Sequence, residues 1–495
     1  MKYFLGIDLG TSYFKAGLFD EKGRLCGLGR HVVKKNFGEG SSSELSVDIF
    51  WETLRQCVND ALRSSNLLPN AISALSYSSQ ANSFILLDEE DNHLTNIILW
   101  SDTRVNELPV SLQSLTNRND FTTKTGLGIF PGKHSAIAKI DWIQKNQPDI
   151  WRKVKRILSI SDYLTFSLTG HFVSDMSTSS MTGLLNVTDG KWWEDAINLL
   201  QLDSAQLAEP IQTGVLVGNL VGQGAARIGL TKQTRLITGG LDHHMVAIGS
   251  GGIHSSAISE STGTVLAAVN CKKGYTPREG INIAQSIDPD HYFQMAFNNN
   301  GALALEWYQK EHAPKWTIPE LLELATKIAP TCNGLIAQPN AHTYEGLDGF
   351  VNMTEAHTNA HFVRAILEST GASLLELVEA LEGEQTTKRI ASSGGGAKSR
   401  LWLQIKADIL NKSFLVPETS ELACKGAAML SAVGSGYFTN LGEAMDKQEK
   451  SEEIIYPDLK RVGIYHEWYN KIKHIRYASF DKSGNHQQGK RISPH

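Results

Sequence analysis

The 495-residue chain lacks the features that mark exported, membrane-bound or nucleic-acid-binding proteins. The carboxylate of Asp8 comes too early in the chain for a secretory signal peptide, and no apolar run approaches the length of a membrane span. The net charge of −5 leaves no basic surplus, and no polybasic run is present. We therefore expect a cytoplasmic protein that binds neither nucleic acid nor a membrane.

Cysteine is also scarce. The five cysteines form no Cys-x-x-Cys pair and have no histidine at metal-ligand spacing, so we expect reduced thiols, most of them buried. What is present is a chain with 41% hydrophobic and 20% charged residues, long enough for two or three domains with sizeable cores. The cysteines are Cys26, Cys57, Cys271, Cys332 and Cys424.

A glycine-threonine turn occurs twice, as Gly10-Thr11 and as Gly263-Thr264, about half the chain length apart. Each turn lies between two strand-like apolar runs, which predicts a β-hairpin. Such a turn can direct backbone N–H groups and a hydroxyl at one point, so two of them facing each other would hold a phosphate chain. A single turn would more often be only a turn; the repeat favours two similar lobes. The runs are 3–7, 14–19, 257–258 and 265–269.

Strand-like and helical patterns alternate along the rest of the chain, which favours an α/β protein. A strand at 235–238 meets Gly239-Gly240 and enters a short helix, so Asp242 is expected at a strand-to-helix elbow. Three glycines within 249–252 mark the best domain boundary. The other expected elements are helices at 51–62, 137–143 and 163–168, two strands at 72–76 and 83–87 that close on the loop between them, and a long amphipathic helix at 361–380.

A second glycine-rich turn lies in the second half. A short strand at 390–392 runs into the glycines that begin at Gly394, and Leu401, Ile405 and Ile409 predict a helix that begins near Ser399. A strand, a turn and a helix N-terminus in this order can bind an anion or a nucleotide. The alternative is a tight turn in a parallel sheet.

Taken together, these segments resemble the FGGY family of carbohydrate kinases, and are most similar to its xylulokinase branch. The resemblance covers about residues 2–477, and two signature stretches agree only in part, because Ala136 and Asn352 depart from the usual residues. The matching segments are GIDLGTSYFKAGLFD at 6–20, GGLDHHMVAIGSG at 239–251, STGTVLAAV at 261–269 and SGGGAKSRLWLQIKADIL at 393–410 with the helix 424–434; the partial ones are 139–143 and 357–368.

The resemblance implies an α/β fold with two RNase H-like domains, of the superfold shared by actin, Hsp70 and the sugar kinases, and a nucleotide cleft between them. Residues 1–249 would bind the sugar and carry the catalytic base, and 250–480 would bind ATP. The polar stretch 481–495 is expected to be a frayed tail.

The same resemblance implies which residues act. Asp242 would be the general base, and a carboxylate at the head of a short helix stays ionised; its alternative is an ordinary helix N-cap. Asp8 would hold Mg²⁺, through water, unless it only caps the Gly10 turn. The residues implied to contact ATP are Thr11, Ser12 and Lys15 on one side, and Gly263, Thr264, Gly395, Gly396, Ala397 and Arg400 on the other.

The acceptor pocket is the least determined part. Glycerol kinases have an Arg-Glu pair where this chain has Ala81 and Asn82, and xylulokinases have a Met-His pair, so neither pair is present. Neutral amides favour a polyhydroxylated neutral acceptor. The candidates are Gln80, Ala81, Asn82, Trp100, Asp102, His134, His243 and Asp242; the open alternatives are that Trp100 is core, that Asp102 pairs with Arg104 and that His134 is a surface residue.

The hypothesis is therefore an ATP- and Mg²⁺-dependent kinase of a small sugar or polyol, with a ketopentose such as xylulose favoured and glycerol, gluconate or another polyol as alternatives. An actin- or Hsp70-like ATPase switch shares the phosphate hairpins and stays open as a second class. The 79–83 loop and Trp100, which suit a small acceptor, favour the kinase. A homodimer is left open.

Overall fold

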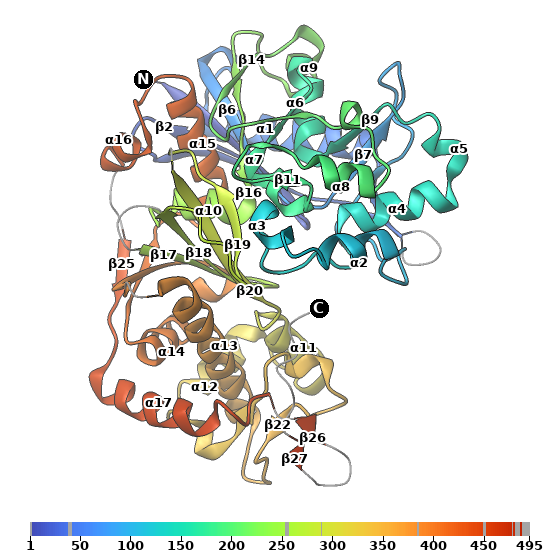
Figure 1. The fold of residues 1–495 in the computed structure, drawn as a ribbon. Coiled ribbons are helices and arrows are strands. Elements are labelled where there is room, and N and C mark those ends of the chain that lie inside the picture. Colours follow the sequence, from blue (N-terminus) through green and yellow to red (C-terminus); the bar gives the residue numbers. More distant parts are fainter. Residues whose placement is uncertain are drawn as a thin grey trace. The chain divides into compact units, whose positions relative to one another are not determined.

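The computed structural model describes residues 2–37, 42–252, 257–288, 290–383, 386–448 and 452–477, together with 479–480 and 486–487 (Figure 1). These residues form two compact units. The first unit consists of Met1–Gly251, Cys271–Gln294 and Glu421–Lys450, and the second of Gly252–Asn270, Met295–Ser420 and Ser451–His495. The predicted division at residue 249 stays a prediction, and the predicted tail lies outside the described residues apart from 486–487.

The first unit is built on a seven-stranded mixed sheet in the order β14-β15-β6-β1-β2-β3, with β16 pairing β6. β1 and β2 form the predicted antiparallel hairpin around Gly10, and β6 lies parallel to β1 on its other side. The strands are β1 (Tyr3–Leu9), β2 (Tyr13–Asp20), β3 (Leu25–Val32), β6 (Ile72–Ser79), β14 (Leu216–Asn219), β15 (Arg235–Ile237) and β16 (Gly240–Leu241).

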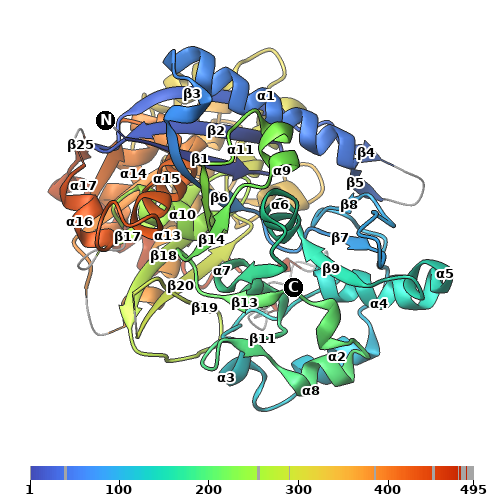
Figure 2. The ribbon, with the colours of Figure 1, turned by 90° about the horizontal axis from the view of Figure 1, so that it is seen from above.

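Helices cover both faces of this sheet, and glycines let them approach closely. α1 (Val47–Ser65) packs along β2 and β3 (Figure 2). A Cβ on Gly29 of β3 would stand 1.9 Å from the Cys57 carbonyl oxygen of α1. α15 (Leu422–Gly434) packs on the other face of β1, where a Cβ on Gly6 would stand 1.8 Å from the Cys424 carbonyl oxygen. Side chains alternate between the faces of a strand, so Gly6 faces α15 while Ile7 joins the core beside α1.

A second seven-stranded sheet repeats this arrangement in the order β19-β20-β18-β17-β23-β24-β25. β17 and β18 form the second predicted hairpin, and β23 lies parallel to β17 as β6 does to β1. The internal repeat that the two glycine-threonine turns predict is therefore present in the strand order. The strands are β17 (Ala257–Thr262), β18 (Leu266–Lys273), β19 (Asn282–Gln285), β20 (His291–Asn298), β23 (Arg389–Gly394), β24 (Ser413–Pro417) and β25 (Glu452–Ile455).

In the second unit, α13 (Asn359–Glu382) lies between α12 (Ile318–Ala325) and α14 (Arg400–Leu410), as Figure 1 shows. The prediction of an amphipathic helix was correct in position but wrong in character, because α13 is buried almost all round over its first sixteen residues. A helix covered on several sides does not need a polar stripe. α14 confirms the helix predicted after the glycine turn, with Ser399 as its N-cap.

The expected pairing of the strands near 72–76 and 83–87 was wrong. β6 belongs to the first sheet, whereas β7 (Phe84–Leu87) lies in a separate five-stranded sheet of the order β4-β5-β8-β7-β9. The loop between them carries the chain from one sheet to the other, and it contains the predicted acceptor residues. The remaining strands of this sheet are β4 (Asn36–Phe37), β5 (Ser43–Leu45), β8 (Ile97–Ile98) and β9 (Arg156–Ser159).

The other predicted helices are present as α4 (Ala136–Asn146), α6 (Ile160–Thr169) and α10 (Asp242–Gly249). All five cysteines are unpaired, and three of them are buried. Within the described part of the chain, none of the helices combines the length and the apolar character that crossing a membrane requires. The further helices used below are α7 (Met176–Ser179), α11 (Leu303–His312) and α17 (Leu459–Ile472).

Candidate active site

Three parallel strands of the first unit end side by side. Across β6, Ser78 is opposite both Asp8 and Gly240, and Ser79 is opposite both Leu9 and Leu241. The residues that follow these strands, among them Gly10, Gln80 and Asp242, therefore leave the sheet at the same edge. Ligands of open α/β sheets bind at the carboxyl ends of the strands. The first unit thus brings two predicted site carboxylates, Asp8 and Asp242, to a common edge.

Asp8 lies at this edge with only 7% of its surface exposed. The Ser78 hydroxyl donates to its Oδ1 at 3.0 Å, and Lys15 Nζ stands 3.4 Å from its Oδ2. Burial raises the pKa of the Asp8 carboxyl above its usual value; the Lys15 charge opposes this, and the Asp242 charge adds to it. The two carboxylates are therefore close enough to repel each other, which a cation between them would relieve.

Lys15 contacts two carboxylates. Its Nζ lies 3.0 Å from Glu421 Oε2, in addition to its contact with Asp8. Burial alone would lower its pKa, but these two negative charges raise the pKa of the ammonium above its usual value, so it stays charged. Glu421 was not predicted from the sequence, because it lies at the N-terminus of α15, more than 400 residues away from Lys15.

Asp242 is the first residue of α10, at the elbow that the sequence predicts. It is half-buried, and its Oδ1 accepts from the His243 backbone N–H at 2.7 Å. The N-cap of α10 is Leu241. The alternative that Asp242 is an ordinary N-cap is not what the structure shows. A carboxylate at this position is stabilised by the helix dipole and can accept a proton from a bound hydroxyl.

Ser177 of α7 holds this elbow in place. Its hydroxyl oxygen accepts from the Leu241 N–H at 2.9 Å, and the hydroxyl group also forms a hydrogen bond with His244 Nδ1 at 2.8 Å. Burial lowers the pKa of His244 to about 3, so its ring is neutral and Nδ1 can accept. A Cβ at Gly240 would stand 2.7 Å from the Ser177 hydroxyl oxygen, which explains the glycine there. Sequence reasoning missed Ser177, which lies 65 residues before Asp242.

A chain of hydrogen bonds links the predicted acceptor loop to the first hairpin. Gln80 Nε2 donates to the carbonyl oxygens of Leu9 and Gly10 at 3.2 and 3.3 Å, and the Ser83 hydroxyl donates to Gln80 Oε1 at 3.0 Å. Trp100 then donates its backbone N–H to the Ser83 oxygen, at 2.9 Å. Gln80 is buried, and its amide fixes the turn; contact between Gln80 and an acceptor stays a prediction.

Trp100 connects the loop to the threonine of the turn. Its Nε1 donates to Thr11 Oγ1 at 2.7 Å, and the side chain is 37% exposed. Trp100 is thus not a core residue, which was its open alternative. Ser12 is exposed at the tip of the same turn, and its carbonyl oxygen accepts from the Val33 N–H at 2.9 Å.

The remaining candidates for binding the acceptor differ in solvent exposure. Asp102 is fully buried and pairs with Arg104 at 2.8 Å, the alternative that the sequence left open. His134 is exposed, and Ala81 and His243 are partly exposed. Asn82 takes up a positive φ of 61°, and its Oδ1 accepts from the Ala136 N–H at the start of α4, at 3.0 Å.

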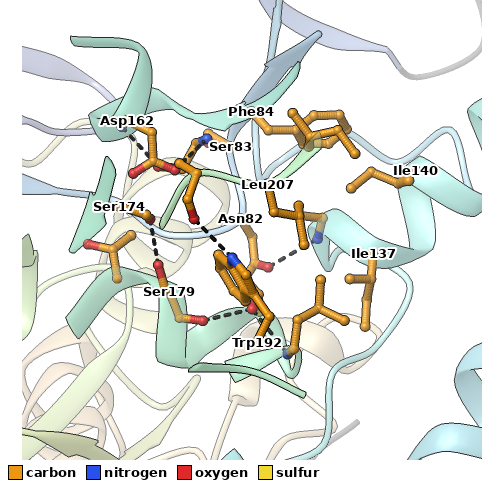
Figure 3. A pocket seen from close by; sticks show the side chains of 17 residues that line it. Asn82, Ser83, Phe84, Ile137, Ile140, Asp162, Ser174, Ser179, Trp192 and Leu207 are labelled. Carbon is orange, nitrogen blue, oxygen red and sulfur yellow. Dashed lines mark hydrogen bonds between the residues drawn. The ribbon is translucent and has the colours of Figure 1, made fainter. Parts of the chain in front are cut away.

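Asn82 also lines a cavity of about 50 Å³ inside the first unit (Figure 3). Apolar side chains such as Phe84, Ile137 and Leu207 line most of the wall, and polar groups line one end. Among these polar groups, burial raises the pKa of Asp162 to about 6. The other polar lining residues include Ser174, Thr178 and Ser179, and Figure 3 shows the hydrogen bond between Ser174 and Ser179.

In the second unit, the hairpin tip at Gly263 and Thr264 is closely surrounded by backbone. The Ala302 N–H, at the start of α11, donates to the Gly263 carbonyl oxygen at 2.7 Å. A Cβ at Gly301 would stand 2.4 Å from that oxygen, so only glycine fits there. Thr264 itself is exposed. The tip is therefore fixed by its neighbours while its threonine remains accessible.

The glycine turn predicted to bind adenosine follows β23 in the same unit. Gly394 has a φ of 79°, and a Cβ there would stand 2.6 Å from the Thr262 carbonyl oxygen, so this position requires glycine. Gly395 is exposed, Gly396 is buried and Ala397 is partly exposed. Arg400 is 80% exposed and pairs with Glu453 at 2.8 Å, as a side chain that points to solvent would.

The carboxylates at the strand ends fit a magnesium ion that arrives with nucleotide phosphates. Mg²⁺ usually takes one or two carboxylates and completes its shell with waters and phosphate oxygens. Asp8, buried at the strand ends, supplies one such carboxylate, and it interacts electrostatically with Asp242. Across the described ranges, no group of three or more His, Cys, Asp or Glu side chains is placed to hold a metal by itself.

The sequence and the structure both match proteins of known class. Residues 3–249 match the N-terminal domain, and residues 262–435 the C-terminal domain, of the FGGY family of carbohydrate kinases. The chain is 29% identical over 488 residues to a xylulose kinase of Bacillus subtilis, covering 96% of this chain and 97% of the relative. It is 27% identical to a gluconokinase of Bacillus licheniformis over 88% of each chain.

A ligand-bound xylulose kinase from Lactobacillus acidophilus has a similar structure, with a TM-score of 0.85 at 22% identity, covering 96% of this chain and 98% of that one. The fold is thus the two-domain α/β fold of the sugar kinases, shared with actin and Hsp70, as predicted. The chain belongs to the FGGY family of carbohydrate kinases. It is an ATP-dependent phosphotransferase that acts on a sugar-like alcohol, which confirms the enzyme class predicted from the sequence.

Proposed function

We propose that this kinase transfers the γ-phosphoryl group of ATP to a hydroxyl of a ketopentose such as xylulose, with Asp242 as general base. The observation that carries the assignment of the base is the arrangement at the strand ends, where the half-buried Asp242 begins α10 beside Asp8. The xylulose kinases among the relatives support the choice of acceptor. Gluconate, glycerol or another polyol is the alternative, and the gluconokinase relative keeps it open.

In the proposed step, the Asp242 carboxylate accepts the proton of the acceptor hydroxyl as its oxygen bonds to the γ-phosphorus. The bond from that phosphorus to the oxygen bridging to the β-phosphate breaks, and its electron pair leaves with ADP. A magnesium ion bound with the nucleotide would neutralise phosphate charge, and Asp8 would hold it. The positive charge of Lys15 lowers the pKa of the Asp8 carboxyl and so opposes the rise that burial causes.

The proposal assigns ATP to residues of both hairpins and the glycine turn. Thr11 and Ser12 would contact phosphates from the first hairpin, and Lys15 would do so only by loosening one of its ion pairs. The residues assigned to ATP in the second unit are Gly263, Thr264, Gly395, Gly396, Ala397 and Arg400. The division into a sugar domain at 1–249 and an ATP domain at 250–480, the cytoplasmic location and the homodimer stay predictions.

For the acceptor, the proposal uses Trp100, Ala81, Asn82, His134 and His243 together with Asp242. Trp100 is suited to cover a carbon face of the sugar, since it is partly exposed and its indole N–H already bonds to Thr11. The Ala136 N–H donates to the Asn82 amide oxygen, so the Asn82 amide nitrogen can donate to a hydroxyl of the acceptor. Gln80 supports the loop between β6 and β7 through its bonds to the Leu9 and Gly10 carbonyl oxygens, and Asp102 pairs with Arg104.

The test is a coupled assay of ADP formation with ATP and Mg²⁺ over ketopentoses, ketohexoses, polyols, deoxysugars and aldonates. We expect the highest kcat/KM with a ketopentose such as xylulose. A preference for gluconate or glycerol would replace the acceptor but leave the base assignment standing. No acceptor-dependent ADP formation across the panel would contradict the proposal.

A further inference from the structure

The second unit contains a fully buried ion pair behind its hairpin. Glu260 lies on β17 and Lys406 on α14, both side chains have no exposed surface, and Lys406 Nζ stands 2.8 Å from Glu260 Oε1. Burial lowers the pKa of Lys406, and the Glu260 charge opposes this. This ion pair was not predicted from the sequence, because its two residues are 146 positions apart.

Both charges bind the same hydroxyl. Lys406 Nζ donates to Thr262 Oγ1 at 2.6 Å, and the Thr262 hydroxyl donates to Glu260 Oε2 at 2.8 Å. Thr262 is the last residue of β17 and directly precedes the hairpin tip of Gly263 and Thr264. The ion pair therefore fixes the side chain of Thr262, the residue directly before the hairpin tip.

The same network supports the glycine turn. Ser392, on β23, hydrogen-bonds to Glu260 Oε1, and the Ser393 hydroxyl donates to the Glu260 carbonyl oxygen at 2.9 Å. A Cβ at Gly396 would stand 2.8 Å from Thr262 Cβ and 3.3 Å from Lys406 Nζ. The hairpin tip and the glycine turn are thus packed around one set of buried polar groups.

Stability alone does not account for this pair. Replacing a buried ion pair with apolar residues is often neutral or stabilising, whereas removing one partner leaves an uncompensated charge. A pair that shares one hydroxyl does, however, restrict where that hydroxyl can lie, because both charges need it in one geometry. Here the restricted residue links the two turns to which ATP has been assigned.

We propose that Lys406 and Glu260 are positioning residues for the nucleotide, which hold Thr262 so that the hairpin tip and the glycine turn keep the spacing that a nucleoside di- or triphosphate requires. This inference rests on the proposed function, in which both turns contact ATP. Neither side chain reaches the ligand, since both are fully buried. Their effect is expected on nucleotide affinity and not on affinity for the sugar.

The second unit offers a matched control. Arg364 and Glu368 form another buried ion pair on α13, at 3.0 Å, and they too share one hydroxyl, that of Tyr465 on α17. Among the described residues, the hydrogen bonds of this cluster join α13 to α17, to the Ala325 carbonyl oxygen and to Thr331 and Cys332, and none of them reaches the hairpin tip or the glycine turn. Neutralising it changes a comparable amount of buried charge at another place in the unit.

The experiment compares Glu260→Gln/Lys406→Met with Arg364→Met/Glu368→Gln, using the full-length protein. The measurements are the Kd for ADP by titration calorimetry, the KM for ATP, the KM for the acceptor and the thermal midpoint. We expect the first double variant to raise the ADP Kd and the ATP KM at least about tenfold and to leave the acceptor KM within about twofold. The control should leave the ADP Kd, the ATP KM and the acceptor KM within about twofold of the wild-type values, even if its thermal midpoint falls.

Thr262→Val tests the shared hydroxyl without removing either charge, in case the double variant fails to fold. It should raise the ADP Kd about three- to tenfold, since the hydrogen bonds of the Thr262 hydroxyl with Lys406 and Glu260 are lost. A wild-type ADP Kd in Thr262→Val, or in a folded Glu260→Gln/Lys406→Met, would overturn the positioning role while leaving the proposed function intact. If the wild-type protein binds no ADP, the proposed function fails, and the inference fails with it.

Discussion

The two hairpins have the same frame but use their charges differently. Each pairs antiparallel with its own second strand and parallel with a later strand, and each carries a carboxylate near the end of its first strand with a lysine beside it. In the first hairpin, Lys15 lies directly across the ladder from Asp8, and its side chain is 21% exposed. In the second, Lys406 comes from α14, and both charges are fully buried.

This difference separates a chemical role from a supporting role. The Asp8 carboxylate shares its edge of the sheet with Asp242, so it can still bind a cation. Glu260 is fully buried and has both carboxylate oxygens engaged, so it acts through its neighbours Thr262 and Ser392. In the proposed function, Asp8 and Lys15 would therefore take part in the reaction, whereas Glu260 and Lys406 would set the geometry of the second hairpin.

The largest effect is expected from the reactive pair. Asp8→Asn should lower kcat at least about a hundredfold, because each ~1.4 kcal/mol of lost transition-state stabilisation costs a factor of ten in rate. Steady-state kinetics over a range of Mg²⁺ concentrations would measure it. Asp20→Asn is the matched control: Asp20 ends the second strand of the same hairpin, is buried and pairs with Arg24. Equal losses in both variants would show that Asp8 acts only by supporting the hairpin.

A different effect, on the free energy of unfolding, is expected from Glu260 and Lys406. Lys406→Met alone leaves Glu260 as a buried, uncompensated charge and should destabilise the protein by about 3–5 kcal/mol. Adding Glu260→Gln should recover most of this loss, because no charge then remains buried. Lys15→Met should cost less, since its site is partly exposed to solvent. Thermal unfolding of the four proteins tests the order, and a larger loss in Lys15→Met would reverse the comparison.

The smallest effect is a shift of a pH profile. Asp8 must be ionised to bind a cation, burial raises its pKa, and the Lys15 charge counteracts that rise. Lys15→Met should therefore raise the pKa of Asp8 further. Activity that needs the ionised carboxylate is lost as the pH falls through this pKa, so the acid limb of kcat/KM should move to higher pH. An acid limb that stays in place, or moves to lower pH, would contradict the assignment.

The sequence predicted the parts of the fold that are encoded locally. The two hairpins, the elbow at Asp242 and the helix after the glycine turn depend on apolar periodicity and on glycine positions within a few residues, and all are present. The partner of a strand is not encoded in this way. The strands on either side of Gln80 were expected to close on each other but lie in different sheets, because strand periodicity carries no information about which strand pairs with which.

The supporting residues of the candidate site were not predictable for the same reason. Glu421, Ser177 and Lys406 act on residues 64 to more than 400 positions away, and each has an ordinary local context for a helix or its N-terminus. Burial also separates candidates that look alike in sequence. Asp102 and Asp242 were both plausible acceptor contacts, but Asp102 is fully buried against Arg104, whereas Asp242 is half-buried at the strand ends.

In the proposed function, Asp242 removes the acceptor proton, and the decisive variant is Asp242→Asn, because the amide keeps the size of the carboxylate but cannot act as a base. The measurement is acceptor-dependent ADP formation with the best acceptor, together with the ADP Kd of the same preparation. We expect transfer to fall about 10²- to 10⁴-fold while the ADP Kd stays within about twofold. Transfer at the wild-type rate would contradict the account.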